Sequence, residues 1–117
     1  MTMTSKVYVI AQFKAKSGKE AELFEILKAL EPDSLREEGC IQYRVTRQIA
    51  HECATRTEYS IVFNEIWANA EAWAAHGRRA QITNFFEQQV QADTGLVEDV
   101  IVTAYSDEGP AYDKPIF

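Results

Sequence analysis

The stretch YSIVFNEIWANAEAWAAH, residues Tyr59–His76, decides the fold of this chain. Side chains alternate between the two faces of an extended strand. One face therefore carries five residues of this stretch, which are Tyr59, Ile61, Phe63, Glu65 and Trp67. The other face carries Val62 and Ile66, so both faces are largely apolar. Such a strand is normally covered on both sides. Because a chain of 117 residues has helices enough for only one face, something else must cover the second.

The chain before this stretch predicts a strand and then an interrupted helix. Residues Lys6–Ala15 alternate in polarity and predict a strand that ends in the turn Lys16–Gly18. Ser17 and Glu20 have the spacing of a capping box at the start of a helix. An apolar stripe at helical spacing follows, made of Leu23, Ile26, Leu27 and Leu30.

Pro32 interrupts that helix, because proline has no backbone N–H to donate. We expect the helix to restart there and run to Gly39, a residue that readily adopts the left-handed conformation of a helix end. Residues Ile41–Ile49 alternate again and predict a second strand. The polar stretch Ala50–Thr57 predicts the loop of a long hairpin.

After Trp67 the pattern returns to helical. Asn69 is a suitable N-cap for a short helix that runs to His76 and ends at Gly77. Thr94-Gly95 ends a second helical segment before the last strand, Leu96–Tyr105. The apolar stripe of that segment is Ile82, Phe85, Phe86 and Val90.

The order β-α-β-β-α-β is that of a ferredoxin-like α+β fold, with four antiparallel strands and helices on one face. We expect a single domain over residues 1–117, with a core of about residues 6–105 and a tail at 106–117. A second copy of the chain should cover the free sheet face in a homodimer that buries on the order of 1,600 Å² in total. The apolar end of the tail, Ile116-Phe117, indicates either docking, for example onto the partner, or a frayed terminus.

Composition excludes several classes of function. The formal charge of −6 argues against a nucleic-acid surface. There is no run of 18 apolar residues and no basic segment followed by an apolar one, so we expect no membrane contact, no secretory signal and a cytoplasmic protein. The two cysteines, Cys40 and Cys53, are expected to be free thiols.

Several motifs occur in an order that resembles a known family. Glu38-Gly39-Cys40 followed by Tyr43, then Glu65-x-Trp67, then His76 with Phe85 nine places on, resembles the antibiotic biosynthesis monooxygenase family over roughly residues 6–105. That resemblance implies a small dimeric α+β barrel. The family includes cofactor-independent quinol and anthrone oxygenases, haem-degrading enzymes and an isomerase of a signalling molecule. A quinol monooxygenase-like activity without a cofactor is therefore implied, with a small molecule as substrate.

His76 is the first catalytic candidate. A histidine at a helix C-terminus is favoured as imidazolium by about 0.3–1 kcal/mol if exposed, which suits binding an anionic oxygen or shuttling a proton. From position alone, a helix-capping histidine that hydrogen-bonds a free carbonyl is the alternative. The resemblance implies a pocket residue, because the matching histidine lines the pocket in several family members.

Glu65 and Trp67 are the other catalytic candidates, because they share a strand face and can project into a cavity between sheet and helices. We expect Glu65 to lie near enough to His76 to influence its charge. The alternatives are core packing for Trp67, and for Glu65 an ion pair with an arginine such as Arg44 or Arg47. The residues expected to bind substrate are Phe63, Tyr43, Trp73 and Phe85.

Departures from the family pattern limit the chemistry. Many relatives carry a second histidine five places after the first, where this chain has Gln81. Haem-degrading members use an asparagine on the first strand, where this chain offers only Gln12, so haem degradation is not expected. We also expect no metal site and no bound cofactor, because neither ligand spacing nor a phosphate or dinucleotide motif occurs.

Three classes of function remain open. In the first, a base in an aromatic pocket forms the anion of a small electron-rich aromatic such as a hydroquinone, and the anion reacts with O₂. In the second, the same groups act as an isomerase or lyase on a small carbonyl compound. In the third, the dimer binds a small ligand without turnover. We favour the first because of the resemblance.

Overall fold

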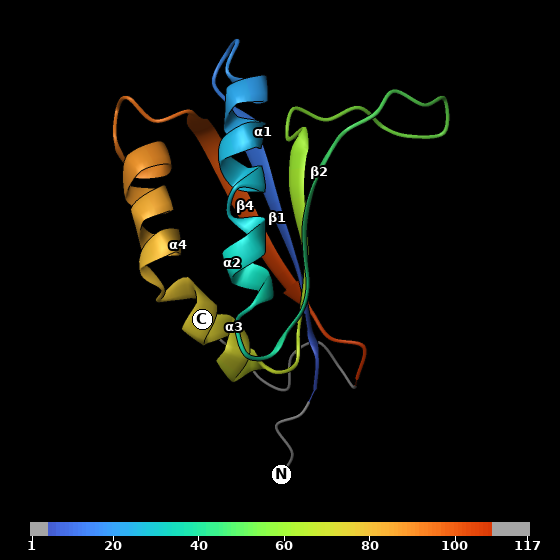
Figure 1. Ribbon diagram of the computed structural model, residues 1–117. Helices are drawn as coiled ribbons and strands as arrows, with labels where there is room; N and C mark the ends of the chain where they lie inside the picture. Colours follow the sequence, from blue (N-terminus) through green and yellow to red (C-terminus); the bar gives the residue numbers. More distant parts are fainter. Residues whose placement is uncertain (1–4, 109–117) are drawn as a thin grey trace, which may run out of the picture.

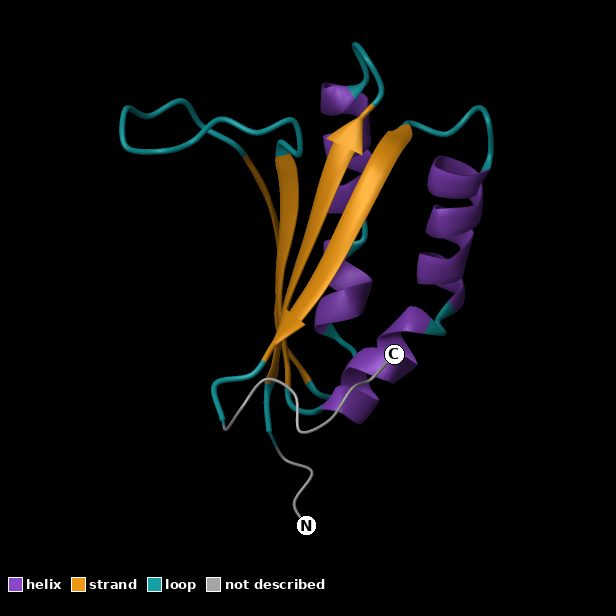
Figure 2. Cartoon of the chain, turned by 180° about the vertical axis from the view of Figure 1, so that it is seen from behind, coloured by secondary structure: helices purple, strands orange, loops and turns teal. Residues whose placement is uncertain are grey.

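The computed structural model describes residues 5–108 as one four-stranded antiparallel sheet with helices on a single face (Figures 1 and 2). The strands are ordered β2-β3-β1-β4, which confirms the predicted ferredoxin-like α+β fold. The elements in chain order are β1 (Val7–Ala15), α1 (Glu20–Lys28), α2 (Glu31–Leu35), β2 (Cys40–Arg47), β3 (Ile61–Trp67), α3 (Ala70–Gly77), α4 (Ala80–Phe85), the π-helix η1 (Phe86–Gln91) and β4 (Val97–Tyr105). No helix among these residues is long and apolar enough to cross a bilayer.

The start of α1 differs from the prediction. The N-cap is Lys19 rather than Ser17, and no side chain caps the helix. Gly18 lies in the turn before it with a left-handed φ of 77°. The carboxylate of Glu20 accepts hydrogen bonds from Arg47 and Ser60 on the sheet. The predicted capping box is wrong because these tertiary partners take the carboxylate that the box would have used.

The helix restarts at Glu31 with Pro32 in its first turn, as predicted, but it ends at Leu35 rather than continuing to Gly39. Gly39 lies in the turn into β2 with a left-handed φ of 85°. A Cβ at Gly39 would lie 2.5 Å from the Cβ of Ala72 on α3. This turn therefore needs glycine both for its backbone conformation and for its close approach to α3.

A bulge changes the beginning of β2. The pairing of β2 with β3 shifts in register between Cys40 and Gln42. Ile41, expected on the same face as Tyr43, is instead 50% exposed, because the extra residue of a bulge turns out of the alternation. The strand also ends at Arg47, before the exposed Ile49.

The helices that follow β3 agree with the prediction. The side chain of Asn69 caps α3 by accepting a hydrogen bond from the backbone N–H of Ala72 at 2.8 Å. In the next segment Ile82 and Phe85 are buried, but the last turns are π-helical rather than α-helical. The expectation for Ile116-Phe117 lies outside the described residues.

The helix-facing side of the sheet forms the core, and the other side is bare (Figure 2). We call this bare side the open face. Cross-strand pairing brings Tyr8 opposite Ile66 and Tyr105 on it. Among its apolar residues Ile101 and Tyr105 are exposed, and the rest are half-buried, namely Tyr8, Ile10, Val62 and Ile66. The structure thus confirms an apolar strip that no helix of the described chain covers.

The two left-handed glycines provide a matched test of the α3 contact. Gly18→Ala introduces backbone strain but no clash, because nothing lies within 4 Å of the added Cβ, and it should cost about 1–2 kcal/mol of unfolding free energy. Gly39→Ala adds overpacking against Ala72 and should cost about 1–3 kcal/mol more. Urea unfolding of both variants measures the difference. Equal losses would show that the turn does not pack tightly against α3.

Candidate functional site

A pocket of about 380 Å³ opens between the sheet and the helices α3 and α4. All four strands contribute to one wall, and most of the lining is apolar. Six of the seven site residues predicted from the sequence line it, which are Tyr43, Phe63, Glu65, Trp73, His76 and Phe85. A larger surface hollow of about 980 Å³ lies beneath the loop between β2 and β3, and its lining mixes polar and apolar residues, none of them buried. The smaller pocket is the candidate site, because an apolar cavity with a few convergent polar groups is typical of small-molecule sites.

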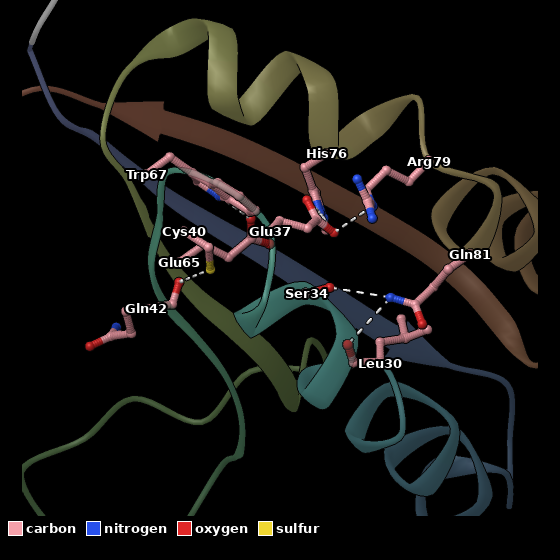
Figure 3. Close-up of polar contacts among 10 residues, drawn as sticks. All are labelled: Leu30, Ser34, Glu37, Cys40, Gln42, Glu65, Trp67, His76, Arg79 and Gln81. Carbon is pink, nitrogen blue, oxygen red and sulfur yellow. Dashed lines mark hydrogen bonds and ion pairs between the residues drawn. The ribbon is translucent and has the colours of Figure 1, made fainter.

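His76, near the end of α3, is the main polar group of the pocket. Only 5% of the residue is exposed. Its Nδ1 lies 3.1 and 3.2 Å from the two carboxylate oxygens of Glu37 (Figure 3). Its ring lies against the indole of Trp67, with 4.7 Å between ring centroids, and 5.1 Å from the ring of Tyr43. The imidazole is therefore fixed from behind by a carboxylate and from the side by two aromatic rings.

Glu37 was not predicted from the sequence. It lies in the short connection between α2 and Gly39, and its side chain is 4% exposed. The guanidinium of Arg79 lies on its other side, with Nε 3.3 Å from Oε2 (Figure 3). The sequence offered only a weak signal, an acidic residue next to the Glu38-Gly39-Cys40 motif. The sequence predicts a helix up to Gly39, but the helix ends at Leu35 and the side chain of Glu37 turns into the interior.

Burial determines the charge of His76. Removal from water lowers the pKa of His76, the hydrogen bond and charge of Glu37 raise it, and Arg79 lowers it further. The net direction is downward, so the imidazole is neutral at neutral pH, contrary to the expectation from the helix end. We assign the proton to Nδ1, because the carboxylate of Glu37 accepts it there. Nε2 has no hydrogen-bond partner among the described residues. Every fully buried side-chain nitrogen and oxygen among these residues has a hydrogen-bond partner, so Nε2 is not fully buried. Because His76 lines the pocket, we infer that Nε2 faces it.

Glu65 projects from β3 into the pocket and is 7% exposed. Its Oε1 accepts a hydrogen bond from the indole N–H of Trp67 at 2.9 Å. Burial raises the pKa of Glu65 to about 7, the hydrogen bond from Trp67 opposes the shift, and the charge of Glu37 adds to it. The alternative ion pair with an arginine is not formed, because Arg47 pairs with Glu20 and Arg44 lies exposed on the open face.

Burial, Glu37 and Arg79 shift the pKa of His76, and Glu65 is not among these causes. The sequence predicts that Glu65 lies near enough to His76 to influence its charge, and this influence is not found. Both acids nevertheless lie close to one another, since the charge of Glu37 contributes to the raised pKa of Glu65.

Trp67 does not line the pocket. It is fully buried, and it contacts the pocket residues from behind by its hydrogen bond to Glu65 and its ring contacts with His76 and Tyr43. This position agrees with the core-packing alternative. Trp67 supports the site and holds the polar groups in place.

Gln81 stands at the position of the second histidine of many relatives, and its side chain makes structural contacts. Its side-chain amide donates to the backbone oxygen of Leu30 at 3.4 Å and to Oγ of Ser34 at 3.3 Å (Figure 3). It therefore ties α4 to the segment around α2. Within residues 5–108 no three His, Cys, Asp or Glu side chains gather in a way that could hold a metal ion.

Comparisons with known proteins agree with this architecture. The family model described as antibiotic biosynthesis monooxygenase matches residues 6–88. A solved structure from Shewanella oneidensis is 29% identical with a TM-score of 0.71, over 88% of this chain and 91% of that one. A protein from Mycobacterium tuberculosis is 22% identical with a TM-score of 0.70, over 92% of this chain and 100% of that one. A dabb family protein with a ferredoxin-like fold from Mesorhizobium loti is 16% identical with a TM-score of 0.68, over 90% of this chain and 99% of that one. The last two show similarity of fold alone. A search of curated proteins found no match.

The two tryptophans near the site should behave differently when truncated. Trp67→Ala removes a fully buried indole and should cost about 3–5 kcal/mol of unfolding free energy. Trp73→Ala removes a partly buried wall of the pocket and should cost clearly less. Denaturant unfolding measures both. A Trp67→Ala loss no larger than that of Trp73→Ala would contradict the assignment of Trp67 to the core.

Glu37 and Arg79 should shift the titration of His76 in opposite directions. Glu37→Gln keeps an acceptor for Nδ1–H but removes the charge that raises the His76 pKa, so the titration midpoint should fall. Arg79→Gln removes a charge that lowers the pKa, so the midpoint should rise. Proton NMR can follow the titration, because the chain has only two histidines and a His76→Gln spectrum assigns the signals. Identical midpoints in all three proteins would contradict the observed cluster.

Proposed function

Because the chain belongs to the antibiotic biosynthesis monooxygenase family, whose model matches residues 6–88, we propose that it is a monooxygenase that oxidises a small electron-rich aromatic alcohol with O₂ and without a cofactor. A hydroquinone is the simplest such substrate. The observation that carries the proposal is the neutral His76, which presents Nε2 to an apolar pocket while Glu37 accepts its Nδ1–H.

In the proposed first step, Nε2 of His76 takes a proton from a hydroxyl of the substrate. The imidazolium that forms is stabilised by the carboxylate of Glu37 directly behind it, 3.1 Å from Nδ1. The same contact keeps the unprotonated nitrogen turned to the substrate. His76 is thus the catalytic base, and Glu37 is a positioning residue.

Two further polar groups of the pocket are available for the substrate oxygens. Burial, and secondarily the charge of Glu65, raises the pKa of Tyr43, so its hydroxyl stays protonated and can donate. Glu65 exists in both protonation states near neutral pH. A water-poor, aromatic-lined cavity also strengthens the attraction between a bound phenolate and the donors of the pocket, which are the imidazolium of His76 and the hydroxyl of Tyr43.

In the second step the aromatic anion supplies the electrons that reduce O₂. One oxygen atom forms a bond to a ring carbon, and the other leaves as water after the O–O bond breaks. For a hydroquinone the balance is one hydroquinone and one O₂ giving one hydroxyquinone and one water. The substrate is oxidised by four electrons in total, two of which form the new C–O bond.

The assembly we propose is a homodimer in which the open faces of two sheets meet. The apolar strip of Tyr8, Ile10, Val62, Ile66, Ile101 and Tyr105 supports it, because burying such a strip against a second copy removes it from water. The pocket lies on the opposite face of the sheet, so each copy would keep its own site.

Removal of the proposed base should abolish most turnover. His76→Gln keeps a polar side chain of similar size, so folding should be retained while oxygen uptake with a hydroquinone falls about 10²-fold or more. Wild-type activity should rise with pH as His76 loses its proton, with a midpoint below the ordinary histidine value of 6.5, and the variant should lose this rise. An oxygen electrode measures both, with His51→Gln as the control in the exposed loop and autoxidation subtracted.

Unchanged oxygen uptake in His76→Gln would overturn the proposed mechanism. Consumption of a substrate without oxygen uptake would indicate an isomerase or lyase instead. Binding without consumption would indicate a ligand-binding protein.

The dimer can be tested by placing a charge on the open face. Ile101→Asp should convert a wild-type dimer into a monomer in light scattering at micromolar concentration, because a buried unpaired carboxylate is strongly unfavourable. Ile49→Asp is the matched control, since Ile49 is 74% exposed in the loop outside the sheet. A monomeric wild-type protein at this concentration would exclude the proposed assembly.

A further inference from the structure

Glu65 carries an acceptor that no described residue uses. Its Oε1 is bound by the indole N–H of Trp67 at 2.9 Å. Its Oε2 has no hydrogen-bond partner among the described residues, although the residue is 93% buried, which follows from its 7% exposure. Every fully buried side-chain oxygen among these residues has a hydrogen-bond partner, so Oε2 is not fully buried. Because Glu65 lines the pocket, Oε2 is open to it.

The acceptor lies near the proposed base. Trp67 contacts both groups, through its N–H to Glu65 and through its ring, whose centroid is 4.7 Å from that of His76 (Figure 3). A ligand with a hydroxyl at Nε2 of His76 therefore lies in the same pocket as Glu65. The hydroxyl of Tyr43 can donate to a ligand oxygen, and the rest of the lining is largely apolar, so Glu65 supplies the carboxylate acceptor for a second donor on the ligand.

The charge around the pocket is negative. No lysine or arginine lines it, Glu65 is part of its wall, and the carboxylate of Glu37 lies directly behind His76. Arg79 approaches Glu37 but is not among the lining residues, and its side chain is 57% exposed. An anionic ligand would bring a further negative charge beside these carboxylates in surroundings with little water to screen it.

We propose that Glu65 determines substrate specificity by accepting a hydrogen bond at Oε2 from a second donor group of an uncharged aromatic diol whose first hydroxyl lies at His76. This inference rests on the proposed function for the class of ligand. A phenol with a single hydroxyl leaves Oε2 desolvated and without a partner, and a site built around such a group discriminates strongly against the analogue that lacks the donor. Aromatic carboxylates are excluded by charge.

The ionised form of Glu65 is the acceptor, so the test belongs at pH 8. The ionisable groups that face Glu65 are Glu37, Tyr43 and Cys40, with His76 in the same pocket. Burial raises the pKa of Cys40 to about 11 and also raises that of Tyr43, while it lowers that of His76. Between pH 6 and 8 the carboxyl of Glu65, with a pKa of about 7, is the group among these whose protonation changes most.

Anaerobic calorimetry with three probes tests the proposal at pH 8. The probes are 1,4-dihydroxynaphthalene, 1-naphthol and 1-naphthoate, which share one ring system. We expect the diol to bind about tenfold or more tightly than 1-naphthol, and 1-naphthoate to bind most weakly. At pH 6, where Glu65 is largely protonated and Oε2 becomes a donor, the preference for the diol over 1-naphthol should shrink.

Glu65→Gln is the decisive variant. The Trp67 N–H needs the amide oxygen, so the NH₂ group faces the pocket and an acceptor is replaced by a donor. The ratio of the two dissociation constants should fall to within about twofold of unity. Glu22→Gln on the exposed face of α1 is the matched control and should keep the wild-type ratio.

Equal affinity of the wild-type protein for the diol and 1-naphthol at pH 8 would overturn the proposal. The proposal also fails if Glu65→Gln keeps the wild-type ratio of the two dissociation constants. If Glu65→Gln does not fold, the comparison of pH 6 with pH 8 in the wild-type protein decides, and an unchanged ratio overturns the role of Glu65. Failure here is distinct from failure of the proposed function, because binding is measured without oxygen. Selective binding with no oxygen uptake contradicts the oxygenase and supports the role of Glu65.

Discussion

The fully buried indole of Trp67 is the contact on which the site depends. Its N–H holds one oxygen of Glu65, and its ring lies against His76 and near Tyr43. Three polar groups from two strands and a helix are thereby fixed relative to one another without any bond among themselves. Because the indole has no exposed surface, this geometry is maintained by the packing of the core rather than by a ligand. The turn at Gly39 completes the support, since it brings Glu37 behind His76 and packs against α3.

Removal from water has the same consequence for each ionisable group of the pocket, because it disfavours whichever form is charged. It raises the pKa of Glu65 and Tyr43 and lowers that of His76, so all three shift toward their neutral forms. The net direction at His76 is downward although the residue lies near a helix C-terminus, an end that favours the charged form. A neutral imidazole with the carboxylate of Glu37 directly behind it suits proton abstraction from a weak, uncharged acid.

Family membership and the pocket contribute different parts of the functional argument. The family match and the fold place the chain among proteins of one architecture, but architecture alone does not select a reaction. The side chains of the pocket and its surroundings limit which groups can act as acid or base. Gln81 is engaged with Leu30 and Ser34, so a single imidazole serves the pocket, and its partner is an acid from the other half of the chain. The proposed substrate class rests on what lines the cavity, which is apolar surface and one acid, Glu65, with no lysine or arginine.

The sequence by itself determined the strand and helix order, because alternation along β3 and the cap at Asn69 are local patterns with local causes. The alternation along β3 places Glu65 and Phe63 on one strand face, and the resemblance to the family implied that His76 lines the pocket. Tertiary structure decided the rest. The bulge at Ile41, the replacement of the capping box by contacts of Glu20 with the sheet, and the burial of Trp67 behind the pocket all depend on neighbours distant in sequence. The partnership of Glu37 with His76 joins residues 39 positions apart. No periodicity reports such a contact, because it exists only once the turn at Gly39 and the end of α3 have packed together.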